Sequence, residues 1–140
     1  MYKKIMVGYD GTKFSDCALK EAIALTKDSG ATLLLVTVPE ISPEISEVAP
    51  EINDLLAERA RVGLNRAATE AKSAGIACET EIVMADSAHA GLVDTATKNK
   101  IDLIVVGTHG RTGFIRLFMG GTTARVIGLA PCNVLVVRCR

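Results

Sequence analysis

Five short apolar segments alternate with segments of helical periodicity along the 140-residue chain. The apolar segments 32–38 and 101–106 are continuous rather than alternating, a pattern typical of strands buried on both faces of a parallel sheet. The sequence therefore predicts an α/β fold with strands at residues 5–9, 32–38, 78–84, 101–106 and 133–138.

Helices are predicted between successive strands. Apolar residues recur at helical spacing after Ser15, a candidate N-cap, until Gly30 ends the first helix. Further helices are predicted at 51–73, 87–99 and 122–129. The segment 39–50 holds three prolines and three glutamates, so we predict an extended, acidic surface loop that acts as a flap.

The order of the strands follows from the handedness of their connections. Right-handed crossovers between parallel strands favour a doubly wound five-stranded sheet, strand order 3-2-1-4-5, with helices on both faces. The alternating third segment is predicted at an edge, and the strongly apolar fourth segment is predicted to be central. Ligands of such sheets bind at the carboxyl ends of the strands where the order reverses, here between the first and fourth strands.

The composition argues against several classes of protein. Sixteen basic residues balance sixteen acidic ones, so no net charge attracts the chain to nucleic acid or to an anionic membrane. No apolar segment approaches the roughly 20 residues that span a bilayer, and no secretory leader pattern opens the chain. We expect a cytoplasmic protein with neither nucleic acid nor membrane as a partner.

The four cysteines do not predict a metal site, because they are scattered and lack Cys-x-x-Cys spacing. We expect Cys17, Cys78 and Cys132 to be small packing residues in a reducing compartment. Cys139 is expected to be exposed.

A glycine-rich segment follows the fourth strand, with five glycines between positions 107 and 121. Glycine lets backbone N–H groups approach a phosphate closely, and the last two glycines precede a predicted helix whose N-terminus favours an anion. The candidate phosphate-binding residues are Gly107, His109, Gly110, Arg111, Gly113, Gly120, Gly121, Thr122 and Thr123. Asp10, Gly11 and Thr12 follow the first strand and face the same switch point.

Other nucleotide and hydrolase motifs do not match. The spacing Gly107-x-x-Gly110-x-x-Gly113 differs from the dinucleotide fingerprint, and no P-loop or G-x-S-x-G elbow occurs. The sequence contains no evident hydrolytic triad, so we assign no catalytic residue.

The whole chain, residues 1–140, resembles the universal stress protein family as a single domain. The family pattern of G-x-x-G, nine residues and a further glycine is met by Gly107, Gly110 and Gly120. The opening segment 5–12 and the closing segment 131–137 are similar to the family's first and last strands. The resemblance implies an adenine nucleotide alpha-hydrolase-like fold and a stress-response role.

Family members that retain the glycine motif bind ATP. By this resemblance Asp10 contacts the adenosine, Val38 lies against the adenine, Gly107 lies near the ribose, and Gly110 and Gly120 lie along the phosphates. ATP and AMP remain alternatives, and Mg²⁺ is expected only as a companion of the phosphates. Two positions depart from the pattern: Gly121 replaces a serine or threonine, and Ala85 replaces a glycine after the third strand, which is expected to narrow the approach.

Three functions remain open at this point. The first is a non-enzymatic regulatory protein that binds ATP or AMP; the second is a slow ATPase; the third is a nucleotide-independent dimeric scaffold. No residue is evident that positions an attacking water, so any hydrolysis is expected to be weak. A homodimer is expected through the apolar edge of the fifth strand, at Val134, Leu135, Val136 and Val137.

Overall fold

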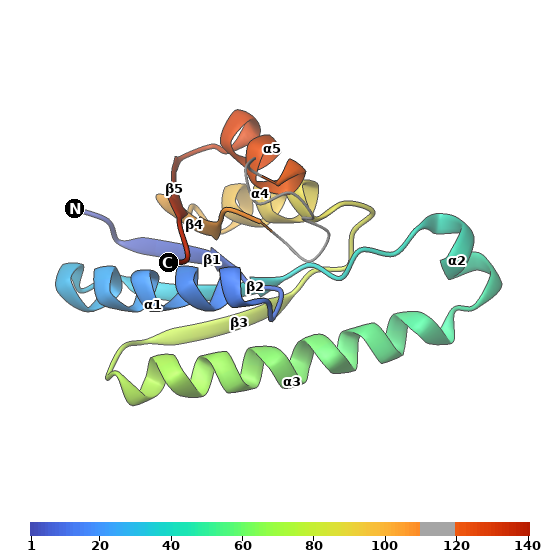
Figure 1. The fold of residues 1–140 in the computed structure, drawn as a ribbon, viewed down its shortest axis with the longest axis horizontal. Coiled ribbons are helices and arrows are strands. Elements are labelled where there is room, and N and C mark those ends of the chain that lie inside the picture. The colour runs from blue at the N-terminus through green and yellow to red at the C-terminus, as the bar shows by residue number, and fades with distance from the viewer. Residues whose placement is uncertain (110–119) are drawn as a thin grey trace.

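The computed structural model describes residues 1–109 and 120–140. It contains a five-stranded parallel sheet in the order β3-β2-β1-β4-β5, which confirms the predicted topology (Figure 1). The strands are β1 (Lys4–Gly8), β2 (Thr32–Thr37), β3 (Cys78–Ile82), β4 (Leu103–Gly107) and β5 (Asn133–Val137). The middle strand is β1 rather than β4, although β4 also has a neighbour on each side and is buried along its whole length.

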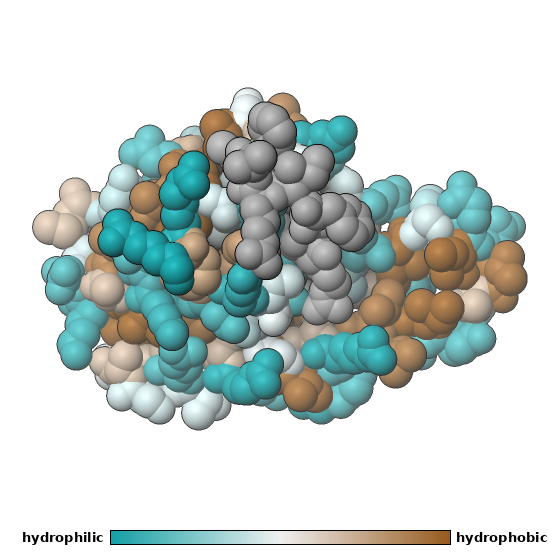
Figure 2. All heavy atoms as spheres, viewed as in Figure 1, coloured by the Kyte–Doolittle hydropathy of each residue, from teal (hydrophilic) through white to brown (hydrophobic). Residues whose placement is uncertain are grey.

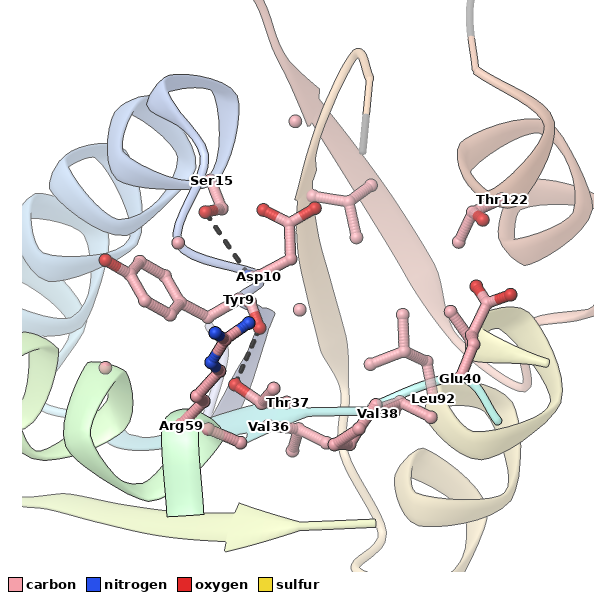
Figure 3. Close-up of a pocket in the computed structure, with 18 of the residues that line it drawn as sticks. Tyr9, Asp10, Ser15, Val36, Thr37, Val38, Glu40, Arg59, Leu92 and Thr122 are labelled. Carbon is pink, nitrogen blue, oxygen red and sulfur yellow. Dashed lines mark hydrogen bonds between the residues drawn. The ribbon is translucent and has the colours of Figure 1, made fainter. Parts of the chain in front are cut away.

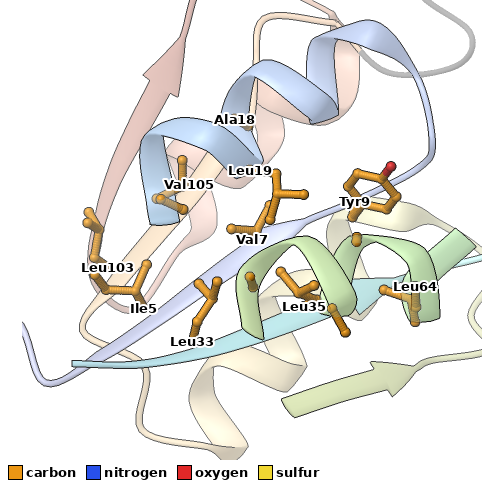
Figure 4. Packing of buried hydrophobic residues seen from close by; sticks show 14 of the residues in the cluster. Ile5, Val7, Tyr9, Ala18, Leu19, Leu33, Leu35, Leu64, Leu103 and Val105 are labelled. Carbon is orange, nitrogen blue, oxygen red and sulfur yellow. The ribbon is translucent and has the colours of Figure 1, made fainter. Parts of the chain in front are cut away.

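Helices cover both faces of the sheet, as predicted. The helices are α1 (Lys13–Ser29), α2 (Pro43–Val48), α3 (Glu51–Ser73), α4 (Ala88–Lys98) and α5 (Gly121–Leu129). On one face, α1 and α3 pack against one set of alternate strand residues, including Val7, Leu35 and Val105 (Figure 4). On the other face, α4 and α5 pack against the intervening set, including Met6, Val36 and Ile104. This alternation explains why the strand sequences are continuously apolar.

The edge strand β3 is the most polar of the predicted strands. Glu79 and Thr80 are exposed, whereas the flanking residues of the strand are half-buried. Its position at the end of the sheet confirms the expectation drawn from its alternating sequence.

The first helix begins earlier than predicted, and its N-cap is Thr12 rather than Ser15. The Thr12 hydroxyl oxygen accepts a hydrogen bond from the Ser15 amide at 3.4 Å. Ser15 instead lies inside the first turn, where its hydroxyl donates to the Thr12 carbonyl at 3.0 Å. Both residues are good capping types, and the turn at Asp10-Gly11 decides which of them begins the helix.

The prediction of an extended loop at residues 39–50 was wrong, because residues 43–48 form the short helix α2. Ser42 caps this helix by accepting a hydrogen bond from the Ile45 amide at 3.3 Å, and Pro43 occupies its first turn, where proline is favoured. The end of the molecule formed by α2 and the start of α3 exposes apolar side chains, among them Ile45, Val48 and Leu55 (Figure 2).

The expectation that Cys17 is a free packing residue was also wrong. Cys17 of α1 forms a disulfide with Cys139, which follows β5, while Cys78 and Cys132 are free. Among the described residues no helix is long and apolar enough to cross a membrane.

Candidate functional site

A cavity of about 530 Å³ opens at the carboxyl ends of β1, β2 and β4. It lies at the switch point between β1 and β4 where the sequence predicts ligand binding, and its volume is within the range typical of small-molecule sites. Residues of α3, α4 and α5 complete its walls (Figure 3).

One wall of the cavity is apolar. Val36, Val38, Leu92 and Val106 line it from β2, the loop after β2, α4 and β4. The absence of a side chain at Gly91 of α4 leaves room for Val38, since a Cβ there would lie only 2.8 Å from Val38 Cγ1. This wall provides an apolar surface of the kind that buries the hydrophobic part of a ligand.

The turn after β1 carries the predicted residues Asp10, Gly11 and Thr12. The Asp10 carboxylate accepts hydrogen bonds from the Thr12 amide at 3.0 Å and from the Thr12 hydroxyl at 2.6 Å. Gly11 between them has φ +81°, a conformation that favours glycine. Asp10 and Gly11 line the cavity directly, while Thr12 holds the turn and caps α1.

Gly107 ends β4 at the point where α1 approaches the sheet most closely. A Cβ at this position would lie 2.7 Å from the Phe14 carbonyl oxygen. The Gly107 carbonyl accepts a hydrogen bond from the buried Thr123 hydroxyl at 2.8 Å. Gly107 lines the cavity, and its lack of a side chain is required by the packing of α1.

His109 is buried rather than exposed to solvent, with 8% of its surface accessible, and it lines the cavity. Its ring lies 5.1 Å from the Phe14 ring, and its Nδ1 atom lies 3.1 Å from the Thr108 hydroxyl. The packing against Phe14 links this wall of the cavity to the first turn of α1.

The N-terminus of α5 lies at the cavity and has the features of an anion-binding helix end. Gly120 is the N-cap, and as a glycine it offers no side-chain oxygen to the first-turn amides. These amides and the helix dipole favour a negative group. Thr122 and Thr123 line the cavity, whereas Gly120 and Gly121, just before them in the chain, are not among the described residues that line it. The predicted residues Gly110, Arg111 and Gly113 lie outside the described residues.

The structure adds a wall that the sequence analysis missed. The cavity is lined from α3 by Leu56, Arg59, Gly63 and Arg66, so two guanidinium-bearing residues border it. Figure 3 shows Arg59 across the cavity from α5. These positions are spaced three or four residues apart and share one helical face, which is the signal that would have identified them. Glu40, after β2, adds an acidic group.

The two departures from the family pattern have different consequences. Ala85 does not line the cavity; it pairs with Glu40 in an isolated parallel bridge and lines a separate surface hollow. Gly121 has open space around its Cα, since an added Cβ would meet nothing within 4 Å. Among the described residues no group of three His, Cys, Asp or Glu is arranged to hold a metal ion.

Tyr9 connects the cavity to the helices on one face of the sheet. Its hydroxyl donates to the Asp16 carboxylate at 2.7 Å. Burial raises the pKa of Tyr9 to about 12, aided by the hydrogen bond to Asp16 and by that residue's charge, while Arg66 partly offsets the shift. Tyr9, Asp16 and Arg66 therefore link the end of β1 to α1 and α3 at one wall of the cavity.

We expect Tyr9→Phe to lower the free energy of unfolding by about 1 kcal/mol near pH 8, because the Asp16 carboxylate loses its donor. A raised folded-state pKa stabilises the fold fully below the unfolded value of 10.0, and this contribution is lost as the pH rises towards 12. Urea unfolding of both proteins from pH 8 to pH 11 measures the difference between them. The difference in the free energy of unfolding should shrink above pH 10. It should reverse in sign if the stability lost through ionisation of Tyr9 in the unfolded chain exceeds the contribution of its hydrogen bond to Asp16. A difference that stays constant with pH would contradict the raised pKa of Tyr9.

The comparisons with known proteins agree with the fold and the motifs. The pattern of the universal stress protein family matches residues 1–138. The universal stress protein MJ0531 of Methanocaldococcus jannaschii is 36% identical over 142 residues, covering 99% of this chain and 83% of that protein. A universal stress protein of Thermus aquaticus is 31% identical, covering 99% of this chain and 100% of the relative. The chain belongs to the universal stress protein family.

Solved structures of universal stress proteins have the same fold as this chain. The structure of MJ0577 superposes with a TM-score of 0.87 at 27% identity, covering 100% of this chain and 98% of that one. UspA from Lactobacillus plantarum gives 0.85 at 28% identity, with 98% of each chain covered. A universal stress protein solved in complex with cAMP gives 0.77 at 28% identity, with 97% of each chain covered.

Proposed function

We propose that this protein binds an adenine nucleotide, ATP or AMP, in the cavity between β1 and β4 and acts as a regulatory protein rather than an enzyme. The observation that carries the proposal is the cavity itself, which joins an apolar wall to the N-terminus of α5 at the switch point. A family relative of 28% identity that was solved with cAMP supports the class of ligand.

In this proposal the adenine packs against Val38 and Leu92, where the cavity is apolar. The ribose lies near Asp10 and Gly107. The phosphates lie at the first turn of α5, with Thr122 as a hydroxyl donor and Mg²⁺ bound, when present, mainly by phosphate oxygens and water. The lining holds two arginines, Arg59 and Arg66, so it carries no net negative charge from Asp10 and Glu40 that would repel a nucleotide.

The regulatory role is proposed for a cytoplasmic homodimer in a stress response. β5 is an edge strand of the sheet, and Val134 to Val137 are only half-buried along it. Pairing with the same strand of a second copy would satisfy its outer backbone groups and cover these side chains. Sedimentation at micromolar concentration tests this part, and a monomer would contradict it.

Titration calorimetry with ATP, AMP and GTP, with and without Mg²⁺, tests the nucleotide site. Asp10→Ala is expected to weaken adenine-nucleotide binding by at least about 10-fold, because it removes both the carboxylate and the turn that it holds. Asp10→Asn retains an acceptor for the Thr12 amide but removes the negative charge. It therefore distinguishes the contribution of the charge to binding from the contribution of the turn. Asp28→Asn, at the exposed end of α1, is the matched control and should bind like the native protein.

No binding of any adenine nucleotide at millimolar concentration would contradict the proposal and leave the dimeric scaffold as the alternative. Equal loss of affinity in Asp10→Ala and Asp28→Asn would place the ligand elsewhere. Phosphate release measured on the same samples distinguishes a regulatory binder from a slow ATPase.

Gly121→Ser is expected to increase the affinity for ATP about 5-fold, because it places a hydroxyl in the first turn of α5. The open space at this position accommodates the new side chain, and replacing a glycine inside a helix also favours the folded state. Calorimetry with ATP measures the gain, and Gly128→Ser near the far end of α5, also in open space, is the control. An unchanged affinity would show that the phosphates do not reach this turn.

A further inference from the structure

Two cysteines that lie 122 positions apart in the sequence meet beside the cavity. Cys17 lies in the second turn of α1, and Cys139 follows the carboxyl end of β5. Their Cα atoms are 5.5 Å apart, a separation that suits a disulfide. They meet because α1 packs across β4 and β5, with its N-terminal turns at the carboxyl ends of the strands.

We propose that Cys17 and Cys139 form a reversible redox latch, closed by peroxides and opened by dithiols, that fastens residues 138–140 to the first turns of α1. The Cys139 sulfur lies 3.4 Å from the Lys13 carbonyl oxygen in the first turn. The next residue, Phe14, contacts both Gly107 and His109, which line the cavity. The latch is therefore built directly behind one wall of the proposed nucleotide site, although it does not depend on that function.

Both redox states have a defined arrangement in this geometry. In the oxidised state the two sulfurs are bonded to each other. In the reduced state the Cys139 thiol has the Lys13 carbonyl as a hydrogen-bond acceptor within reach.

Closure balances with one molecule of hydrogen peroxide. The thiolate of one cysteine attacks a peroxide oxygen, the O–O bond breaks, and a sulfenic acid and hydroxide form. The second thiolate then attacks the sulfenic sulfur, forms the S–S bond and releases a second hydroxide. The two protons that the thiols lost on ionising convert both hydroxides into water. Two electrons pass from the two sulfurs to the peroxide, and a dithiol returns them when it reduces the bond.

The other two cysteines are placed to stay out of this reaction. Cys78 lies in β3 and Cys132 precedes β5, and both are free thiols. Burial raises the pKa of both thiols, which reduces the share of the reactive thiolate. The 5.5 Å separation of the Cys17 and Cys139 Cα atoms, together with the burial of the other two thiols, favours oxidation of this pair among the four cysteines.

Peroxide treatment of the fully reduced protein, followed by alkylation and tryptic mapping, tests the latch. We expect reduced protein to have four free thiols and oxidised protein two, with the peptide 14–20 linked to residues 139–140. Dithiothreitol should restore all four. The oxidised form should melt about 10 °C higher, because the bond closes a long loop in the unfolded chain.

Two variants make the test specific. Cys17→Ser should keep its three remaining thiols after peroxide treatment and lose the difference in melting temperature, whereas Cys132→Ser should still form the 17–139 link. Four alkylated thiols after peroxide treatment, a link between two chains, or oxidation without a change in melting temperature would each overturn the proposal. None of these measurements uses a nucleotide, so the outcome is separate from that of the calorimetry.

Discussion

Gly107→Ala is expected to lower the free energy of unfolding by about 3 kcal/mol, a large loss for the addition of one methyl group. The added Cβ would lie 2.7 Å from the Phe14 carbonyl oxygen and 2.9 Å from its carbonyl carbon. These are backbone atoms in the first turn of α1, so they cannot move aside by a rotamer change. Either β4 or the helix must shift, and urea unfolding monitored by circular dichroism measures the cost.

The effect should extend to ligand binding, because Phe14 also packs against His109 in the wall of the cavity. Gly121→Ala is the matched control: the same methyl group is added in open space at the start of α5, where no clash arises. We expect this control to be at least as stable as the native protein. If the two variants were equally stable, the close approach of α1 to Gly107 would not be a constraint on the fold.

The order of the strands and the faces of the sheet were predictable because they depend on patterns that a single sequence displays. Continuous apolar segments indicate strands buried on both faces, and right-handed crossovers then leave few possible orders. Once the order is known, the carboxyl ends of β1 and β4 must meet, so Asp10 and Gly107 are predicted to lie close together, and both line the cavity. The paired glycines placed the start of α5 to within one residue, since the helix was predicted from residue 122 and begins at Gly121.

The parts that were missed depend on contacts between distant segments or on competition between similar residues. Nothing near Cys17 in the sequence indicates a partner 122 positions away, because that pairing depends on how α1 crosses β5. Arg59 and Arg66 lie on the exposed side of an amphipathic helix, and only the position of α3 beside β2 turns them towards the cavity. The start of α2 could have been predicted, because Ser42 is a favoured N-cap residue and Pro43 is favoured in the first turn of a helix. The many prolines and glutamates in residues 39–50 instead led to the prediction of a loop.

Ile104→Ala is expected to lower the free energy of unfolding by about 4 kcal/mol. Ile104 is fully buried in β4, opposite Met6 of β1 on one side and Val134 of β5 on the other. Ile104 belongs to the hydrophobic cluster between the sheet and the helices α4 and α5. The same cluster contains Val36 and Val126. The rigid strands prevent the space left by the side chain from closing, so a cavity cost adds to the lost burial.

Ile127→Ala removes the same atoms from α5, one residue after Val126, on a side chain with 46% of its surface exposed. Because alanine also favours a helix, this control should change the free energy of unfolding by less than about 1 kcal/mol. Urea unfolding of the two variants under identical conditions compares them directly. A loss in Ile104→Ala no larger than in the control would mean that α4 and α5 are loosely packed on the sheet, and the N-terminus of α5 would then be too mobile to hold a phosphate.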